Sequence, residues 1–416
     1  MALFNKISAF LKKEAALTRF KTRLLIVFLH ALLLLVFTIL LQYTSFIRYD
    51  EINFLKWASI WKHDVFNSDK KPLAKNVVFL DVSKDLALAD DNAYQQPDST
   101  MKGAQRVITD RVKLAKLFSI LNSHPNEYRY VICDVLFEKP GPGDSVLKPQ
   151  IEKLKNVLTS AITDKGKLVK PIFNVNWAMV NYTAINKSTF TKIPIYYNDS
   201  LKSLPALLYE KTTPNRFSEN RFLTFLNGKP TFNTAIPEFY YRNADLVWPE
   251  SKENFNTYYL GDLLAFPECF SALKDKFIII GDFENDVHST YLGRLPGSLI
   301  LWDAYLTFYT HQVTISVEWL LMLFVFYFLI SYWIIIHPER KLKAIHQKIR
   351  VPFMSKFIIS YISYIGLLVL INIFSYFFFG TFVSLFYIAT YLTLLESLIE
   401  QFPTWRKNLY EYIMTF

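Results

Sequence analysis

The longest uncharged stretch of the chain is the feature that most constrains its fold. Residues 357–395 contain no Asp, Glu, Lys or Arg over 39 consecutive positions. A helix rises about 1.5 Å per residue and the bilayer hydrocarbon is about 30 Å thick, so this stretch is too long for one crossing. Gly380 lies within it, and glycine tolerates backbone conformations that other residues avoid. The pattern predicts a hairpin of two membrane helices, over residues 357–379 and 381–400.

Two further apolar stretches predict membrane helices at 24–45 and 316–336. The first holds no charged side chain and would extend about 33 Å as a helix, enough to cross a bilayer. A cleaved signal peptide is the alternative, but its apolar core is about 7–15 residues and precedes a small-residue cleavage site. We therefore predict a retained N-terminal anchor and four membrane helices, one N-terminal and three C-terminal.

The positive charge is concentrated beside these apolar stretches. The chain has a net charge of +10, and residues 1–23 and 337–356 each carry six basic residues and one glutamate. Because Lys and Arg gather in cytoplasmic loops, both segments and the tail 401–416 are predicted to be cytoplasmic. Residues 46–315 then form an extracytoplasmic domain. A nucleic-acid partner is not expected, since it would need a basic face on a folded domain.

Residues 46–315 alternate short apolar strands with helical patterns. With 52% hydrophobic and 20% charged residues, the chain is not a disordered one and fits a membrane protein with a water-facing part. The alternation predicts an α/β fold with a mixed, largely parallel sheet and flanking helices. Residues 180–260 predict an insertion or excursion strands. The expected strands are 76–81, 130–134, 168–175 and 277–282, and the expected helices are 111–121, 151–162 and 298–310.

Three of the predicted strands end in an aspartate. In open α/β sheets, ligands lie beyond the carboxyl ends of the strands, so these side chains could share one edge. Carboxylates with one histidine could bind Mg²⁺, Ca²⁺ or a cationic ligand. The alternative is that the aspartates cap helices and loop amides. No cofactor is expected, and a metal is left open. The candidate ligand-binding residues are Asp81, Asp134, Asp144, Asp282, Asp286 and His288.

Several short motifs follow one another in an order that suggests a family. They are the strand 78–83 ending in Asp-x-Ser, the Arg-led helix after Thr109-Asp110-Arg111, the Asp-x-x-Phe strand 131–137 followed by Asp144, the segment 280–286, and Leu295-Pro296-Gly297. In these motifs, and in having one span before and three after the α/β domain, the chain resembles the CHASE2-domain membrane sensors. The resemblance covers roughly residues 46–400, and 180–260 hold no motif of the family.

This resemblance implies a sensor of the bacterial inner membrane with its main domain in the periplasm. The cytoplasmic segments are too short to fold as catalytic domains, so a signal would pass through the membrane helices to a separate membrane or cytoplasmic partner protein. Self-association into a homo-oligomer stays open. The alternative is a non-catalytic scaffold subunit of a larger cell-envelope complex.

Enzyme motifs are incomplete, and no enzymatic activity is expected. Gly281-Asp282-x-x-x-Asp286 is similar to a motif of haloacid-dehalogenase phosphatases, but Asp81-Val82-Ser83 lacks that family's second carboxylate. The sequence has no Gly-x-Ser-x-Gly elbow, no His-Glu-x-x-His pair and no P-loop. A disulfide between Cys133 and Cys269 is left open.

Overall fold

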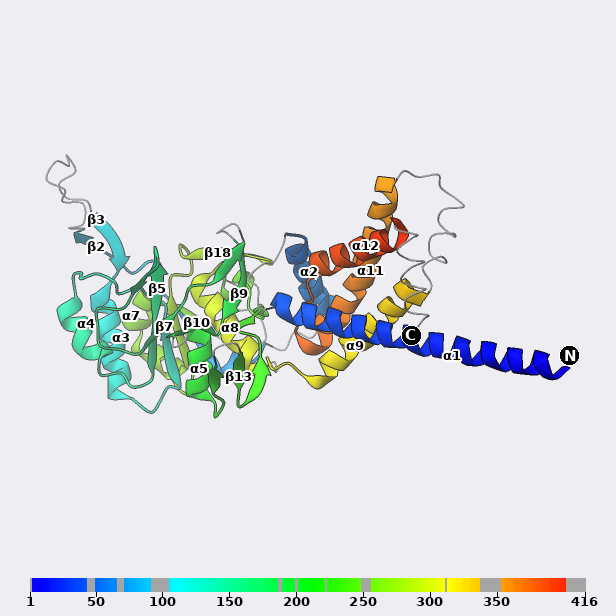
Figure 1. Ribbon diagram of the computed structural model, residues 1–416. Coiled ribbons are helices and arrows are strands. Elements are labelled where there is room, and N and C mark those ends of the chain that lie inside the picture. The colour runs from blue at the N-terminus through cyan, green and yellow to red at the C-terminus, as the bar shows by residue number, and fades with distance from the viewer. Residues whose placement is uncertain are drawn as a thin grey trace. The chain divides into compact units, whose positions relative to one another are not determined.

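The chain forms two units, Met1–Ser45 with Ile315–Phe416 and Phe46–Thr314 (Figure 1). The computed structural model describes residues 2–42, 49–65, 71–90, 105–185, 189–198, 201–220, 223–247, 256–310, 313–336 and 353–401. The predicted cytoplasmic loop 337–356 and tail 401–416 lie largely outside these residues.

The first unit contains the apolar helices. They are α1 (Ala2–Gln42), α9 (Val317–Ile336), α11 (Phe353–Phe379) and α12 (Leu385–Gln401). Among the described residues, three apolar helical segments are long enough to cross a bilayer: Phe20–Gln42, Val317–Ile335 and Ile358–Phe379. The protein is therefore a membrane protein.

The fourth predicted span is not among the described segments long enough to cross a bilayer. Its apolar helix covers Leu385–Leu398 and begins four residues later than expected. The preceding chain is held out of the helix by Asn372, whose Nδ2 donates to the Val383 carbonyl at 2.7 Å while its Oδ1 accepts from the Val383 N–H at 2.6 Å. The turn predicted at Gly380 is present, with φ at +62°.

Polar side chains join the helices of this unit. The Nδ1 of His30 on α1 lies 2.7 Å from Oγ of Ser331 on α9, and its Nε2 lies 3.1 Å from the hydroxyl of Tyr391 on α12. Buried polar groups on membrane helices are usually paired in this way, because hydrocarbon offers them no alternative partner.

The second unit is built on a sheet whose central strands are parallel. The parallel strands are β16 (Asn256–Tyr259), β1 (Val77–Asp81), β17 (Phe277–Gly281), β4 (Tyr130–Cys133) and β5 (Val157–Asp164), adjacent in that order. At the β5 end, β7 (Trp177–Met179) pairs parallel and β6 (Lys167–Val169) antiparallel. The predicted mixed α/β fold is confirmed, and the carboxyl ends of β1, β17 and β4 lie side by side.

Helices cover both faces of this sheet. One face packs against α3 (Arg111–Ser123), α4 (Asp144–Ile151) and α7 (Leu260–Ala265), with fully buried Val78, Leu80, Ile278 and Ile280 in the core. On the other face lie α5 (Leu204–Thr212) and α8 (Gly297–Thr310), where the ring of Phe277 lies 5.3 Å from that of Trp302. Because both faces are covered, the central strands read as continuous apolar runs.

A second, smaller sheet carries one of the candidate residues. Its strands are β15 (Thr234–Ala235), β9 (Thr189–Pro194), β18 (Val287–Thr290) and β19 (Gly293–Pro296) in that order, with β8 (Thr183–Ile185) paired to β9. His288 lies on β18, and β19 leads directly into α8.

Besides the 3-10 helices Ala74–Asn76 and Pro267–Leu273, the remaining described elements lie outside these two sheets. They are α2 (Tyr49–Ile60) with the π-helical turn Trp61–Val65, the hairpin β2 (Leu86–Asp90) and β3 (Gln105–Thr109), β10 (Tyr196–Asn198) with β11 (Leu201–Lys202), β12 (Phe217–Glu219), β13 (Thr224–Leu226), β14 (Lys229–Thr231) and α6 (Asn243–Val247). The excursion strands predicted for 180–260 are therefore present.

Two local predictions were wrong. The helix expected over 151–162 is instead the end of α4 followed by β5, because 157–161 are buried between β4 and β7. Short apolar runs do not distinguish helix from strand by periodicity alone. The strand expected over 168–175 ends at Val169, two residues before Pro171, which has no N–H to donate to a ladder. The two cysteines are free, with Cys133 buried and Cys269 half-buried.

Candidate functional site

Three of the six candidate residues come together at one small pocket. Asp134 follows β4 of the main sheet, Asp286 precedes β18, and His288 lies on β18. The cavity volume is about 50 Å³, room for roughly three water-sized groups at about 15 Å³ each. Its lining residues are Asp134, Val180, Tyr182, Phe190, Asp286, His288, Gly297, Ile300 and Leu301.

Asp134 is the most strongly perturbed carboxyl group of the pocket. Its backbone N–H donates to the Ile280 carbonyl at 2.8 Å, which fixes it at the end of β4. Its Oδ1 accepts a hydrogen bond of 2.6 Å from Oγ of Ser160 on β5. Burial, reinforced by the negative charge of Asp286, raises its pKa to about 7. Asp134 therefore exchanges its proton near neutral pH.

His288 is held between two partners. Its Nε2 lies 3.1 Å from Oδ1 of Asp286, and its Nδ1 lies 3.0 Å from the hydroxyl of Tyr182. The hydrogen bond to Asp286 raises the pKa of His288, and the charge of Asp134 adds to the effect. Burial, and then the charge of Asp286, raises the pKa of Tyr182. The side chains of Asp134, Asp286 and His288 thus interact electrostatically within one pocket.

Two glycines allow α8 to approach the pocket that holds Asp134, Asp286 and His288. A Cβ on Gly297 would lie 2.6 Å from Oδ2 of Asp286 and 3.3 Å from Nε2 of His288. The N–H of Gly297 also donates to the Asp286 carbonyl at 2.8 Å. A Cβ on Gly281 would lie 2.7 Å from the Cβ of Ser298, at the start of α8. The absence of side chains at both positions lets the first turn of α8 form one wall of the pocket.

The other three candidate aspartates satisfy local groups instead. Asp81 is buried, and its Oδ1 accepts from the N–H groups of Ser83 at 2.8 Å and Phe283 at 3.2 Å. Asp282 accepts from the N–H groups of Glu284 at 3.1 Å and Asn285 at 2.7 Å. The strand ends share an edge as predicted, but these side chains accept from backbone N–H groups of the loops that follow β1 and β17. Both residues therefore fit the alternative prediction, that these aspartates accept hydrogen bonds from loop amides.

Asp144 is also used within the fold. It is the first residue of α4, and it pairs with the buried guanidinium of Arg111 while accepting from the Gly141 N–H at 2.8 Å. Arg111 donates further to the Lys139 carbonyl at 2.8 Å. This ion pair joins the start of α3 to the start of α4, and neither residue lines the pocket.

Some pocket residues were not predicted from the sequence. Tyr182 and Phe190 lie in the stretch where no motif was identified. Ser160, which does not line the pocket but donates to Asp134, lies in the strand mistaken for a helix. Gly297 carried a signal, since it belongs to the Leu295-Pro296-Gly297 motif. Across the described ranges, no three His, Cys, Asp or Glu side chains are placed to hold a metal ion.

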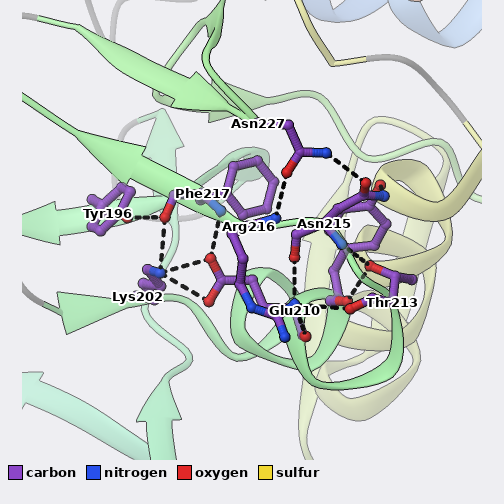
Figure 2. Close-up of polar contacts among 9 residues, drawn as sticks. Tyr196, Lys202, Glu210, Thr213, Asn215, Arg216, Phe217 and Asn227 are labelled. Carbon is purple, nitrogen blue, oxygen red and sulfur yellow. Dashed lines mark hydrogen bonds and ion pairs between the residues drawn. The ribbon is translucent and has the colours of Figure 1, made fainter.

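In a second polar cluster, the side chains form hydrogen bonds and an ion pair with one another (Figure 2). Nζ of Lys202 donates to both oxygens of Glu210, at 2.7 and 2.8 Å, and to the Phe217 carbonyl at 3.2 Å. Oε1 of Glu210 also accepts from the Phe217 N–H, and the Tyr196 hydroxyl donates to the Phe217 carbonyl at 2.9 Å. Because its charged groups are occupied by each other, we interpret this cluster as a structural link between α5, β11 and β12.

Comparisons with known proteins identified no similar protein. The chain matches no protein-family model, and no curated protein or solved structure was found to be similar to it. The fold and the pocket define its class: a membrane protein with an α/β domain and a small acidic pocket at one edge of its main sheet. The resemblance to the CHASE2-domain family stays a prediction.

Proposed function

We propose that the chain is a non-enzymatic sensor of the bacterial inner membrane whose periplasmic α/β domain binds a small ligand between Asp134, Asp286 and His288. The observation that carries the proposal is the convergence of these three residues, from two sheets and one loop, on a single pocket. The predicted resemblance to the CHASE2-domain sensors is consistent with this proposal.

The chemistry of the pocket favours a primary amine. Asp286, and Asp134 in its deprotonated form, offer carboxylate oxygens to an ammonium group, and the Tyr182 hydroxyl can accept a further hydrogen bond. The apolar wall suits a short carbon chain, and the volume admits a head group rather than a large molecule. The apolar wall consists of Val180, Phe190, Ile300 and Leu301.

The position of α8 supports a relay to the membrane. Gly297, Ile300 and Leu301 of α8 line the pocket, and only six residues separate the end of α8 at Thr310 from the start of α9 at Val317. A ligand shifts such an element only by binding one of its conformations better than another. The signal would leave through the membrane helices to a separate partner protein.

The test is ligand-induced thermal stabilisation of the full chain in lipid nanodiscs, with ethanolamine as the probe. Wild type and Asp282→Asn should show the same rise in unfolding temperature, and Asp286→Asn should lose it. Asp282→Asn is the matched control, because it removes one negative charge from the same loop while its side-chain oxygen can still accept from Asn285. Equal responses in the two variants, or stabilisation of wild type by acetate in place of ethanolamine, would refute the proposal.

A scaffold subunit of a larger envelope complex is the second candidate function. It is favoured by the β2–β3 hairpin, where Leu88 and Val107 form a cross-strand pair with 59% and 57% of their surfaces exposed. A solvent-exposed apolar pair on a two-stranded hairpin suits contact with another protein. If the chain is a scaffold, Leu88→Ser with Val107→Thr should reduce the size of its complex on native gels of solubilised membranes. A sensor acting through its pocket alone should show no change in size.

A further inference from the structure

The helix α2 has a buried face and an unusual outward face. It spans Tyr49–Ile60 and continues in a single π-helical turn, Trp61–Val65. Ile52, Leu55 and Ala58 are buried, at spacings that place them on one side of the helix. A surface helix with this pattern normally presents polar residues on its opposite side.

The opposite side of α2 instead presents two tryptophans. Trp57 and Trp61 are four residues apart and are 61% and 50% exposed. Asn53 and Lys56 are exposed beside them. An indole ring combines a large apolar surface with one polar N–H, and this combination is enriched where a membrane meets water. A lysine beside it can extend its ammonium group towards lipid phosphates while its stem stays on the apolar surface.

We propose that the face of α2 formed by Asn53, Lys56, Trp57 and Trp61 binds the interfacial region of the bilayer that α1 crosses. The chain itself supplies the argument for this occupant. Six residues separate the end of α1 at Gln42 from the start of α2 at Tyr49, and so short a segment reaches at most about 25 Å. The start of α2 therefore lies within reach of the membrane surface, on whichever side of the membrane it occupies. Binding there anchors the α/β unit to the membrane surface independently of the ligand pocket.

The test uses tryptophan fluorescence of the full chain in nanodiscs. The emission lost on changing Trp57→Phe together with Trp61→Phe isolates the signal of this face. That signal should be strongly reduced in nanodiscs made with phosphatidylcholine brominated near the top of its acyl chains. Aqueous iodide should reduce it little.

Two control variants calibrate the measurement. The signal lost with Trp177→Phe comes from a half-buried ring on β7, 5.0 Å from the Lys170 ammonium, and should not respond to brominated lipid. The signal lost with Trp333→Phe comes from a ring that is 51% exposed on the membrane helix α9, and should respond. If iodide reduces the signal of the α2 face and brominated lipid does not, the face points to water or to a soluble partner, and the proposal is wrong.

Discussion

The Nε2 atom of His288 lies 3.1 Å from Oδ1 of Asp286, and a Cβ on Gly297 would come within 2.6 Å of the other oxygen of that carboxylate. The ion pair therefore packs directly against the first turn of α8. A change in the charge of either partner therefore alters the contacts at the start of α8, the helix that precedes the second membrane span in the chain. From this contact we expect the pocket to respond both to pH and to small changes in side-chain volume.

Replacing Asp134 by Asn should flatten the pH dependence of stability. The pKa of Asp134 is raised from 3.8 to about 7, so the folded state holds this proton more tightly than the unfolded state. Stability is then lost as pH rises from about 4 to about 7, by up to about 4 kcal/mol at about 1.4 kcal/mol per pKa unit. His288 acts in the same direction, because its raised pKa stabilises the fold below pH 6.5 and this contribution is lost above its folded pKa.

The measurement is the unfolding temperature of the full chain between pH 4.5 and 8. Wild type should lose stability across this range, while Asp134→Asn should lose less and should be the more stable protein at pH 8. The amide oxygen of the variant can still accept from Ser160. Parallel curves for the two proteins would contradict the assignment.

Replacing Gly297 by Ala should disturb the ion pair without unfolding the domain. The added methyl group meets the end of a flexible carboxylate side chain, which can move away. As Asp286 moves, the pKa of His288 should fall and stabilisation by ethanolamine should weaken. Nuclear magnetic resonance of histidine-labelled protein measures the first effect directly.

Gly281→Ala provides the contrast. There the methyl group meets the Cβ of Ser298 at 2.7 Å, so backbone must shift, at a cost of about 1–3 kcal/mol in stability. An unchanged histidine pKa in Gly297→Ala would mean that the carboxylate does not depend on this glycine.

Removing the Arg111 side chain should destabilise the α/β unit strongly. Its guanidinium is buried and paired with Asp144, and breaking a buried pair from one side costs about 3–5 kcal/mol. Arg106→Ala is the control, since its 3.3 Å pair with Glu138 is more exposed and should contribute less than about 1 kcal/mol. Urea unfolding of the full chain measures both. Equal losses of unfolding free energy would show that the buried Arg111–Asp144 pair stabilises the fold no more than the more exposed Arg106–Glu138 pair does.

Removing the Lys202 charge should leave Glu210 buried without its cation. Lys202→Met is expected to cost about 3 kcal/mol, because the carboxylate side chain is only 8% exposed. Adding Glu210→Gln should recover part of this loss, since the amide can still accept from the Phe217 N–H. A double-mutant cycle on unfolding free energies gives the coupling between the two positions. Additive losses would show that the pair is not coupled.

Three of the four predicted membrane helices were predictable, as were the central strands, because their signals are local. An apolar run long enough to cross a bilayer indicates a membrane helix without reference to the rest of the chain. The run Phe277-Ile278-Ile279-Ile280 before Gly281 likewise indicates a buried strand. The edge strand β16 and the strand β5 were missed. Both acquire their conformation from pairing with neighbours, β16 with β1 and β5 with β4 and β7, and their own residues do not specify it.

The sequence alone determined that aspartates would stand at the carboxyl edge of an α/β sheet in a membrane protein. Only the tertiary structure decided which of them meet. Asp81 and Asp282 turn to N–H groups of nearby loops, whereas Asp134 and Asp286 are brought to a histidine on a second sheet and to Tyr182. The physical reason is that a polar side chain is stabilised where hydrogen-bond partners lie within about 3 Å. Strand packing places Ser160 beside Asp134, and the fold brings Tyr182 to the histidine that pairs with Asp286, from a segment more than 100 residues away.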